Sequence, residues 1–548
     1  MTSDLAPRQD TVTRVLAKAV DEFPERIFLD FSGEMYTYAQ VDARATRLAN
    51  GLATLGVKRG DRVGALLDTS LDAIVVWLGA NKLGAIYVPV NTAYKGEYLR
   101  HQLSDAGVEV VFAEPQYVQR LDKVRAGLPT LRMVVQRGDA DPASKHFEVR
   151  RFNDILGSDD PLADANQVSD ISMLIYTWGT SGPAKGCIIS HNYICNLARQ
   201  TARDGNRTAD DINWSPLPLN HISSLGSTVL ACAVTGARAS LYPRFSVTNF
   251  WPEIERSGAT IANLLGSTIA FVAGHPDNEA SKRCFGQLRI IRGSPFSAEL
   301  QATWRSRFGV KTAGSSNYGQ TEACAITSLS DSEYGKPGSS GKRNADFEVR
   351  IVDEDDNELP ANTPGEVIVR PRRAHIMMEG YWGRPSDTLK IMKNLWLHTG
   401  DLGMFDEDGF FYFVDRKKDR LRRRGENISS YEVETTFRAH PAVKDVAVHA
   451  VFSETSEDEV KATIVLKSGA APLTPAELCA WSVDRLPYFA VPRYIEFRME
   501  LPRNPVGRVM KYVLCDQGCT AATWDRERAE KRWPPRRQAR RQTKPRGM

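Results

Sequence analysis

Helical and strand patterns alternate between Tyr38 and Val90, and no other feature of the chain constrains its fold as strongly. Apolar residues recur on one face of residues 38–55, which predicts an amphipathic helix. A second helix is predicted at residues 71–83. Strands are predicted around it and further along the chain, at residues 62–67, 85–90, 108–112 and 261–265. This order predicts an α/β fold in which helices cover a sheet.

A length of 548 residues exceeds what one hydrophobic core usually supports, so two or three domains are expected. Strand patterns at residues 348–352 and 367–370 predict a β-rich, barrel-like region that closes a large N-terminal domain of mixed α/β subdomains. A charged run near residue 415 marks the boundary to a small α+β domain. The predicted parts are residues 1–415, residues 416–515 and a basic, disordered tail at residues 516–548.

Composition excludes several classes of protein. The hydrophobic share of 42% and the charged share of 25% are those of a soluble globular chain. The longest apolar stretch, residues 71–90, contains Asp72, Asn81 and Lys82, which argues against a membrane span. The eight cysteines form no CxxC pair, so reduced thiols and no zinc site are expected. Because the N-terminus lacks a signal-peptide pattern, a cytoplasmic location is expected.

Positive charge is concentrated at the C-terminus. Residues 526–548 contain ten Lys or Arg and two Glu, whereas the whole chain has a net charge of +4. A Pro- and Arg-rich segment of this kind is typical of a solvated appendage. Contact of this tail with anionic surfaces is the alternative, and no nucleic-acid partner is expected.

The segment Tyr176–Gly186, YTWGTSGPAKG, has the composition of a phosphate-binding loop. It combines three glycines, which allow close backbone approach, with three aliphatic hydroxyl side chains and Lys185. Backbone N–H groups and a lysine around one concavity bind anions. The apolar run before it, residues 171–175, predicts a buried strand. An ordinary turn is the alternative explanation.

Five motifs in order along the chain resemble those of the adenylate-forming superfamily, which includes acyl-CoA synthetases, adenylation domains and luciferases. The segment Tyr176–Gly186 is similar to YTSGTTGxPKG of that superfamily. The other four segments resemble its YGxTE, TGD, GRxKDxIxxxGxxIxPxEIE and PxTxxGKxxR motifs, and they lie at Asn317–Ala323, Leu397–Gly403, Asp415–Glu434 and Leu501–Leu514. Within the superfamily the chain looks most like stand-alone bacterial acyl-CoA ligases of the betaine/carnitine type.

The resemblance implies an AMP-forming acyl-CoA ligase of fatty acid or carboxylic acid metabolism. Such enzymes activate a small carboxylic acid with ATP as acyl-AMP, release pyrophosphate, and then transfer the acyl group to coenzyme A. ATP, Mg²⁺ and coenzyme A are therefore the implied cofactors and co-substrates, and a monomer or homodimer is implied. The small domain is implied to be mobile.

The resemblance also implies roles for individual residues. The triphosphate would be bound by residues of the loop, which are Thr177, Thr180, Ser181, Gly182 and Lys185. Glu322 matches the magnesium ligand. The adenine and the AMP phosphate would be contacted by two short segments, which are Gly293, Ser294 and Pro295, and Tyr318, Gly319, Gln320 and Thr321.

The remaining implied roles concern the ribose, the hinge and the acyl group. Asp401 would accept the ribose hydroxyls, with Arg416 as a second contact. Lys418 matches the hinge of the small domain, and Gly425 belongs to the coenzyme A side. His221 lies in a segment similar to the acyl pocket, although a packed core histidine is an equal alternative.

Two positions depart from the superfamily pattern. Trp178 replaces a small serine in the loop, and Arg508 stands where the adenylation lysine is expected. Arginine keeps the charge but not the geometry of an ammonium, so Arg508→Lys is expected to raise acyl-AMP formation. Lys511 is the alternative cation. These departures leave open a paralogue that binds nucleotide without catalysis.

Two further alternatives concern the step after adenylation. One is an enzyme that loads a carrier protein, and the other is a luciferase-like oxygenase. No Asp lies between Pro216 and Leu225 to pair with a substrate ammonium, although amino-acid-activating relatives have one in this region. This absence favours a carboxylic acid that is not an amino acid.

Overall fold

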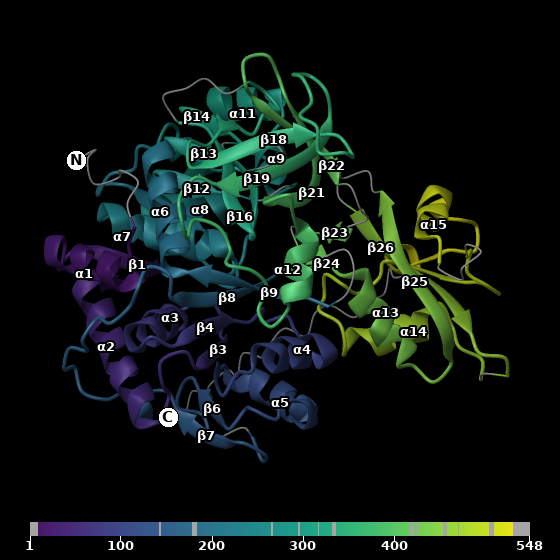
Figure 1. Cartoon of the computed structure of the whole chain (residues 1–548), viewed down its shortest axis with the longest axis horizontal. Coiled ribbons are helices and arrows are strands. Elements are labelled where there is room, and N and C mark those ends of the chain that lie inside the picture. The colour runs from purple at the N-terminus through teal and green to yellow at the C-terminus, as the bar shows by residue number, and fades with distance from the viewer. Residues whose placement is uncertain are drawn as a thin grey trace, which may run out of the picture. The chain divides into compact units, whose positions relative to one another are not determined.

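Two seven-stranded sheets form the framework of the larger unit of the chain (Figure 1). The computed structural model divides into two units, Met1–Arg420 and Leu421–Met548. It describes residues 9–141, 144–177, 183–264, 267–293, 296–315, 317–330, 336–416, 421–423, 426–452, 458–469, 471–503 and 509–529. None of the helices in these ranges combines the length and the apolar character that a bilayer-spanning helix requires.

The first sheet carries the loop that the sequence singled out. Its strands are, in spatial order, β7 (Glu148–Arg151), β6 (Met133–Gln136), β5 (Val110–Ala113), β3 (Arg62–Leu66), β4 (Ile86–Pro89), β8 (Ile171–Thr177) and β9 (Lys185–Ser190). Neighbouring strands are parallel except β8 and β9, which form an antiparallel pair at one edge. The helical segments of this region are α2 (Tyr38–Thr54), α3 (Leu71–Leu83), α4 (Gly96–Ala106), α5 (Pro115–Val124), η2 (Arg125–Gly127) and η3 (Asn153–Ile155).

Helix α3 is a core helix that fixes β8. Every residue from Ala73 to Asn81 is buried, which explains why Asn81 is the only polar side chain among them. A Cβ atom at Gly79 would lie 3.0 Å from the Ala45 carbonyl oxygen, so glycine permits the close approach of α2. The buried Asn81 Oδ1 accepts a hydrogen bond from Ser172 of β8 at 2.7 Å. Asn81, one of the polar residues that argued against a membrane span, therefore holds β8 against helix α3.

The second sheet presents the carboxyl ends of several parallel strands at one edge. Its strands are, in spatial order, β14 (Thr312–Gly314), β13 (Ile290–Arg292), β12 (Ile261–Asn263), β10 (Ile212–Ser215), β11 (Arg238–Leu241), β1 (Ile27–Phe31) and β2 (Glu34–Thr37), of which β2 is antiparallel to β1. The associated helices are α1 (Val12–Glu22), α6 (His191–Asp204), the π-helix η4 (Ser223–Leu230), α7 (Ala231–Thr235), α8 (Phe250–Ser257), α9 (Ser267–Gly274), α10 (Glu279–Arg283) and α11 (Ala298–Phe308).

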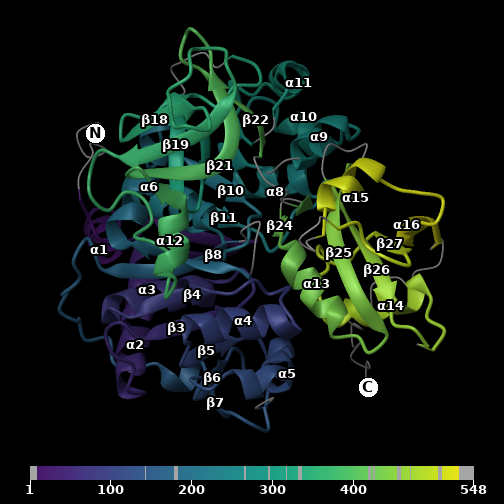
Figure 2. The same ribbon diagram turned by 45° about the vertical axis from the view of Figure 1, so that its right-hand side comes forward.

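The β-rich region expected after the sheets is present (Figure 2). Five antiparallel strands form one sheet. Four of them lie in the order β18 (Phe347–Val352), β19 (Gly365–Pro371), β21 (Trp396–Phe405) and β20 (Met392–Lys393), and the fifth, β22 (Phe411–Arg416), pairs with β21. A smaller sheet and a helix complete the region, with β15 (Asn317–Gln320), β16 (Ala323–Ser328), β17 (Lys342–Arg343) and α12 (Pro385–Ile391). The predicted α/β class with a β-rich part is confirmed.

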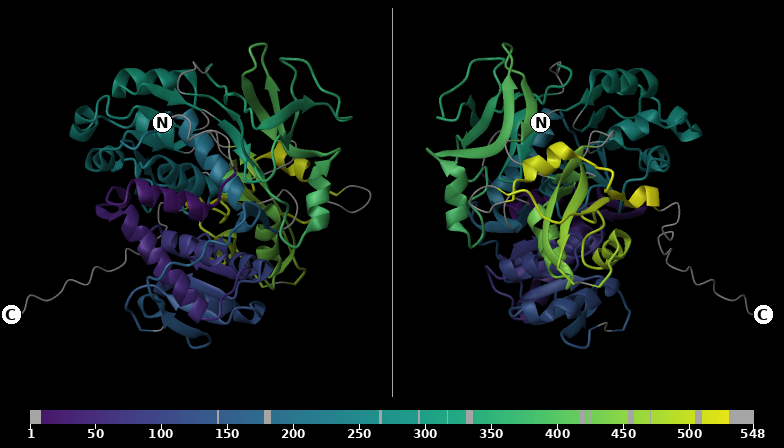
Figure 3. Two further views of the ribbon diagram at one scale, coloured as in Figure 1. Left: turned by 60° about the vertical axis from the view of Figure 1, so that its left-hand side comes forward. Right: turned by 90° about the vertical axis from the view of Figure 1, so that its right-hand side faces the viewer.

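The second unit is a small α+β structure (Figure 3). Its main sheet has four strands, β25 (Val443–Phe452), β26 (Asp458–Leu466), β27 (Tyr494–Phe497) and β28 (Trp524–Asp525), and a separate pair is β23 (Leu421–Arg423) with β24 (Glu426–Ile428). The helices are α13 (Ser430–Arg438), α14 (Pro475–Val483), α15 (Lys511–Gln517) and α16 (Arg526–Ala529).

Both domain boundaries differ from the expected ones. Arg416 ends β22 and pairs with Asp401 of β21, so the large unit extends past residue 415. The Thr520 and Thr523 hydroxyls donate hydrogen bonds to Glu496 at 3.0 and 2.6 Å, and β28 pairs with β27. Because these contacts satisfy a buried carboxylate, the small unit continues to residue 529 rather than ending at 515. Residues 530–548, most of the expected tail, lie outside the described residues.

Candidate active site

The predicted phosphate loop connects β8 to β9, where Thr177 pairs with Lys185 across the hairpin. These two residues therefore stand at the two ends of the loop. A Cβ atom at Gly186 would lie 3.1 Å from the ring of Tyr176, so glycine suits this tight strand pair. The central loop positions named in the sequence, Trp178, Thr180, Ser181 and Gly182, lie outside the described residues.

The motif NYGQTEA folds as a tight hairpin of β15 and β16. Gln320 pairs with Ala323, so Thr321 and Glu322 form the turn between the strands. A Cβ atom at Gly319 would lie 2.8 Å from a backbone nitrogen of β16, which leaves room for glycine only. Tyr193 of α6 supports the turn, since its hydroxyl donates to the Thr321 carbonyl at 2.9 Å.

Glu322 joins this hairpin to the phosphate loop. Its side chain is buried, with the residue 6% exposed. Oε1 accepts hydrogen bonds from Thr177 Oγ1 at 3.1 Å and from the Tyr381 hydroxyl at 2.7 Å. Among the residues that the structure describes, no hydrogen-bond donor contacts Oε2. One oxygen of this carboxylate is thus fixed, and the other has no protein partner in the described chain.

Lys185 lies beside the same tyrosine. Its Nζ is 3.8 Å from Asp387 Oδ2 and 5.1 Å from the centre of the Tyr381 ring. The backbone around Tyr381 runs along β9, because Ile188 N donates to Gly380 O at 2.9 Å. A hydrogen bond from Lys390 lowers the pKa of the Asp387 carboxyl, against a smaller opposing effect of burial. The ammonium group of Lys185 is therefore placed by the Asp387 carboxylate and by the aromatic ring of Tyr381.

Tyr381 and Asp387 were not anticipated from the sequence. They lie in the segment GYWGRPSDT. Its Gly380, Gly383 and Pro385 indicate turns, and it has no pattern of charged or nucleophilic residues that would indicate a site. Only the pairing of this segment with β9, shown by the Cys187–Tyr381 bridge, places its side chains at the loop.

Cys187 is next to this cluster but is not a nucleophile. Burial raises the pKa of its thiol well above the usual range, and the nearby Glu322 carboxylate adds to the effect. The thiol is therefore protonated and unreactive at neutral pH. Its Sγ lies 3.8 Å from Thr177 Oγ1, where it packs under the end of β8.

A second group of predicted residues meets at Asp401. This carboxylate is 4% exposed on β21 and lies opposite Arg416 in the strand register. The Tyr318 hydroxyl donates to Asp401 Oδ2 at 2.8 Å. The Tyr318 ring packs against Phe411, with 4.7 Å between the ring centres. Three residues assigned to the nucleoside are thus adjacent in the fold.

The other predicted positions are more separate. Gly293 follows β13, and its carbonyl accepts a hydrogen bond from Ser315 Oγ at 2.8 Å. His221 is half-buried in the turn before the π-helix η4, and π-helical segments are frequent at functional sites. The remaining predicted residues lie outside the described part of the chain, and they are Ser294, Pro295, Lys418, Gly425 and Arg508.

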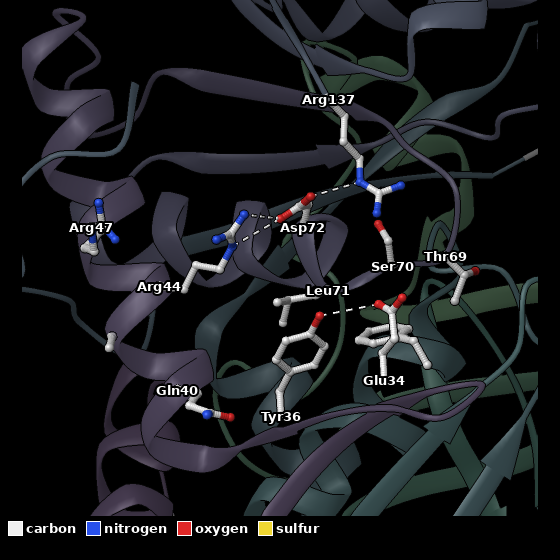
Figure 4. A pocket seen from close by; sticks show the side chains of 12 residues that line it. Glu34, Tyr36, Gln40, Arg44, Arg47, Thr69, Ser70, Leu71, Asp72 and Arg137 are labelled. Atoms are coloured by element: carbon white, nitrogen blue, oxygen red, sulfur yellow. Dashed lines mark hydrogen bonds and ion pairs between the residues drawn. The ribbon is translucent and has the colours of Figure 1, made fainter. Parts of the chain in front are cut away.

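A cleft of about 600 Å³ lies elsewhere in the large unit, between α2, the β1–β2 hairpin and the start of α3 (Figure 4). Its lining includes none of the predicted site residues. Arg44 and Arg137 both point toward Asp72, and each binds this carboxylate at 2.9 Å. Two of its arginines are therefore compensated by one carboxylate, and none of the motif residues reaches this cleft.

The comparison with protein families identifies the chain. Residues 16–382 match the AMP-binding enzymes, and residues 432–508 match the C-terminal domain of AMP-binding enzymes. The chain belongs to the AMP-binding enzyme family. The resemblance noted from the five motifs is thereby confirmed.

Similar proteins share nearly the whole length of this AMP-binding enzyme. It is 28% identical over 488 residues to the crotonobetaine/carnitine–CoA ligase of Salmonella paratyphi B, covering 87% of this chain and 92% of that one. The o-succinylbenzoate CoA synthetase (MenE) of Bacillus subtilis, solved with a product analogue, is 26% identical with a TM-score of 0.78, covering 92% and 98%. ATP-bound MatB of Rhodopseudomonas palustris is 25% identical with a TM-score of 0.67, covering 93% and 99%.

Proposed function

We propose that this AMP-binding enzyme is an ATP-dependent acid–thiol ligase, which activates a carboxylic acid as acyl-AMP and transfers the acyl group to coenzyme A. The observation that carries the proposal is the meeting of Thr177, Lys185 and Glu322 around one loop. A cation and a carboxylate at a backbone loop are what a metal–triphosphate complex requires.

Each group at this site has a part in the proposed first step. The loop and Lys185 bind and neutralise the β- and γ-phosphates, so that the carboxylate of the substrate can approach the α-phosphate. Thr321 contacts the AMP phosphate, while Tyr318 and Asp401 bind the adenine and the ribose. Displacement of pyrophosphate then leaves a mixed anhydride. Arg508 is proposed to stabilise the charge that develops at the α-phosphate.

Magnesium fits this arrangement. Among the described residues, no three His, Cys, Asp or Glu side chains are grouped as a metal cage. Mg²⁺ is commonly held by one or two carboxylates together with substrate phosphates and waters, so Glu322 Oε2 would be the protein's ligand to it. When bound, the ion neutralises the charge on the leaving pyrophosphate.

The second step is proposed to use coenzyme A, with Lys418 as the hinge, Gly425 on the thiol side and His221 at the acyl group. The names of the similar ligases and synthetases, which act on carboxylic acids and coenzyme A, support this acceptor. Carrier-protein loading is the alternative.

A panel of carboxylic acids tests the proposal. The full chain is incubated with ATP, Mg²⁺ and each acid, with and without coenzyme A, and pyrophosphate release and acyl-CoA mass are measured. Acid-dependent pyrophosphate release with formation of acyl-CoA is expected. Nucleotide binding without AMP formation would instead indicate a paralogue that has lost catalysis, and acyl-AMP that only a carrier protein consumes would exclude coenzyme A.

A further inference from the structure

The hydrogen bonds at Glu322 are unevenly divided between its two oxygens. A carboxylate oxygen has two lone pairs, and two donors therefore saturate it. Thr177 and Tyr381 both donate to Oε1, and no donor in the described chain contacts Oε2. The two donors come from different segments, so together they hold Oε1 from two directions. Oε2 is the oxygen without a protein donor among the described residues.

Tyr381 is itself rigidly placed. The residue is 9% exposed, and its backbone N donates to Thr388 Oγ1 at 2.9 Å. Its backbone also forms a bridge with Cys187 of β9, and Trp382 N donates to Gly186 O at 2.8 Å. A side chain on such a support can hold another group in one orientation.

The same ring contacts the loop lysine. Lys185 Nζ lies 5.1 Å from the centre of the Tyr381 ring, which is within cation–π range. Tyr381 thus touches both the carboxylate proposed to bind the metal and the cation proposed to bind the phosphates. Neither contact was expected from the motifs of the sequence.

We infer that Tyr381 is a positioning residue for the metal–nucleotide complex. Its hydroxyl orients the Glu322 carboxylate so that Oε2 would face the cation. This inference rests on the proposed function. It does not require Tyr381 to touch the substrate. Partners that orient a metal ligand typically contribute about 10- to 100-fold to metal affinity, and a loss in this range is expected when the hydroxyl is removed.

The test uses Mn²⁺ as the probe and no carboxylic acid, so that it does not depend on turnover. ATP affinity of the full chain is measured by calorimetry with Mn²⁺ and with a chelator, and the ratio gives the gain due to the metal. Tyr381→Phe is expected to reduce this gain about 10-fold or more, while metal-free ATP affinity changes little. Thr177→Val removes the other donor to Oε1 and is expected to act in the same direction, so if Tyr381→Phe does not fold, a Thr177→Val variant that keeps the wild-type gain would overturn the orientation of Glu322 through Oε1.

Tyr38→Phe is the matched control. Tyr38 is fully buried, and its hydroxyl donates to the carbonyls of Cys232 and Ala237 at 2.9 and 2.7 Å. The control loses buried hydrogen bonds of the same kind and should keep the wild-type gain from Mn²⁺. A wild type that gains nothing from Mn²⁺ would refute the proposed function itself. A wild type with a clear gain that Tyr381→Phe retains would overturn the role of Tyr381 alone.

Discussion

Gly293→Ala introduces one methyl group directly after β13, close to Leu264 and to Ile269 of α9. The new Cβ would lie 2.3 Å from Ile269 Cδ1 and 2.7 Å from the Leu264 carbonyl oxygen. The Ile269 methyl group is the end of a flexible side chain and can rotate away. The Leu264 carbonyl is a backbone atom, so it cannot rotate away as a side-chain end can, and Leu264 N is itself hydrogen-bonded to Arg292 O at 2.9 Å.

The strain must therefore be relieved by movement of the backbone after β13. Overpacking of one methyl group in a tight site typically costs about 1–3 kcal/mol of unfolding free energy. Since residues 293–295 are proposed to border the adenine, part of this strain should appear as weaker ATP binding. If about 1.4 kcal/mol of this strain weakens the binding free energy of ATP, the Kd for ATP rises about tenfold.

Urea unfolding and calorimetric titration with ATP measure the two effects. Gly274→Ala is the matched control, because a Cβ at this exposed last residue of α9 meets nothing within 4 Å. Its unfolding free energy should be unchanged or up to about 1 kcal/mol higher, as helix propensity predicts. If Gly293→Ala were as stable as Gly274→Ala and bound ATP normally, the steric reasoning would be refuted.

Three further predictions concern charged groups. Glu322→Gln keeps an oxygen for Thr177 and Tyr381 but puts an NH2 group, which cannot ligate a cation, in the place of Oε2, so normal folding with loss of Mg²⁺-dependent pyrophosphate release is expected. Asp401→Asn should weaken ATP binding about tenfold, and equal weakening of inorganic pyrophosphate binding would contradict a ribose contact. Burial opposes ionisation of Glu496, but hydrogen bonds led by that from Lys461 outweigh it and lower its pKa from 4.5 to about 2. The stability that this carboxylate contributes is therefore complete above pH 4.5 and is lost as the pH falls toward 2, and acid unfolding of Glu496→Gln should lack this dependence.

The sequence predicted elements well where local patterns and burial agree. Helix α3 was predicted with the bounds that the structure has, because its apolar residues are buried on all sides. Glu322 and Asp401 were found through motifs, and their burial and partners support the choice. Tyr381 was missed because its contact with Glu322 spans 59 residues and depends on how its segment pairs with β9. The short strand β28 was missed for a similar reason, since its two residues pair with a strand far earlier in the chain.

If the proposed roles hold, the two units divide nucleotide binding from the adenylation chemistry. Lys185, Glu322 and Asp401 belong to the large unit, whereas Arg508 belongs to Leu421–Met548. Lys511, the alternative cation, is already held by Glu434 at 2.6 Å and by the Ser430 hydroxyl at 2.7 Å. Since those two contacts compensate Lys511 within its own unit, Arg508 is the residue expected to supply positive charge to the α-phosphate. Loss of the Arg508 charge, as in Arg508→Ala, should then lower the rate of acyl-AMP formation, while ATP affinity, which we propose to depend on the large unit, stays the same.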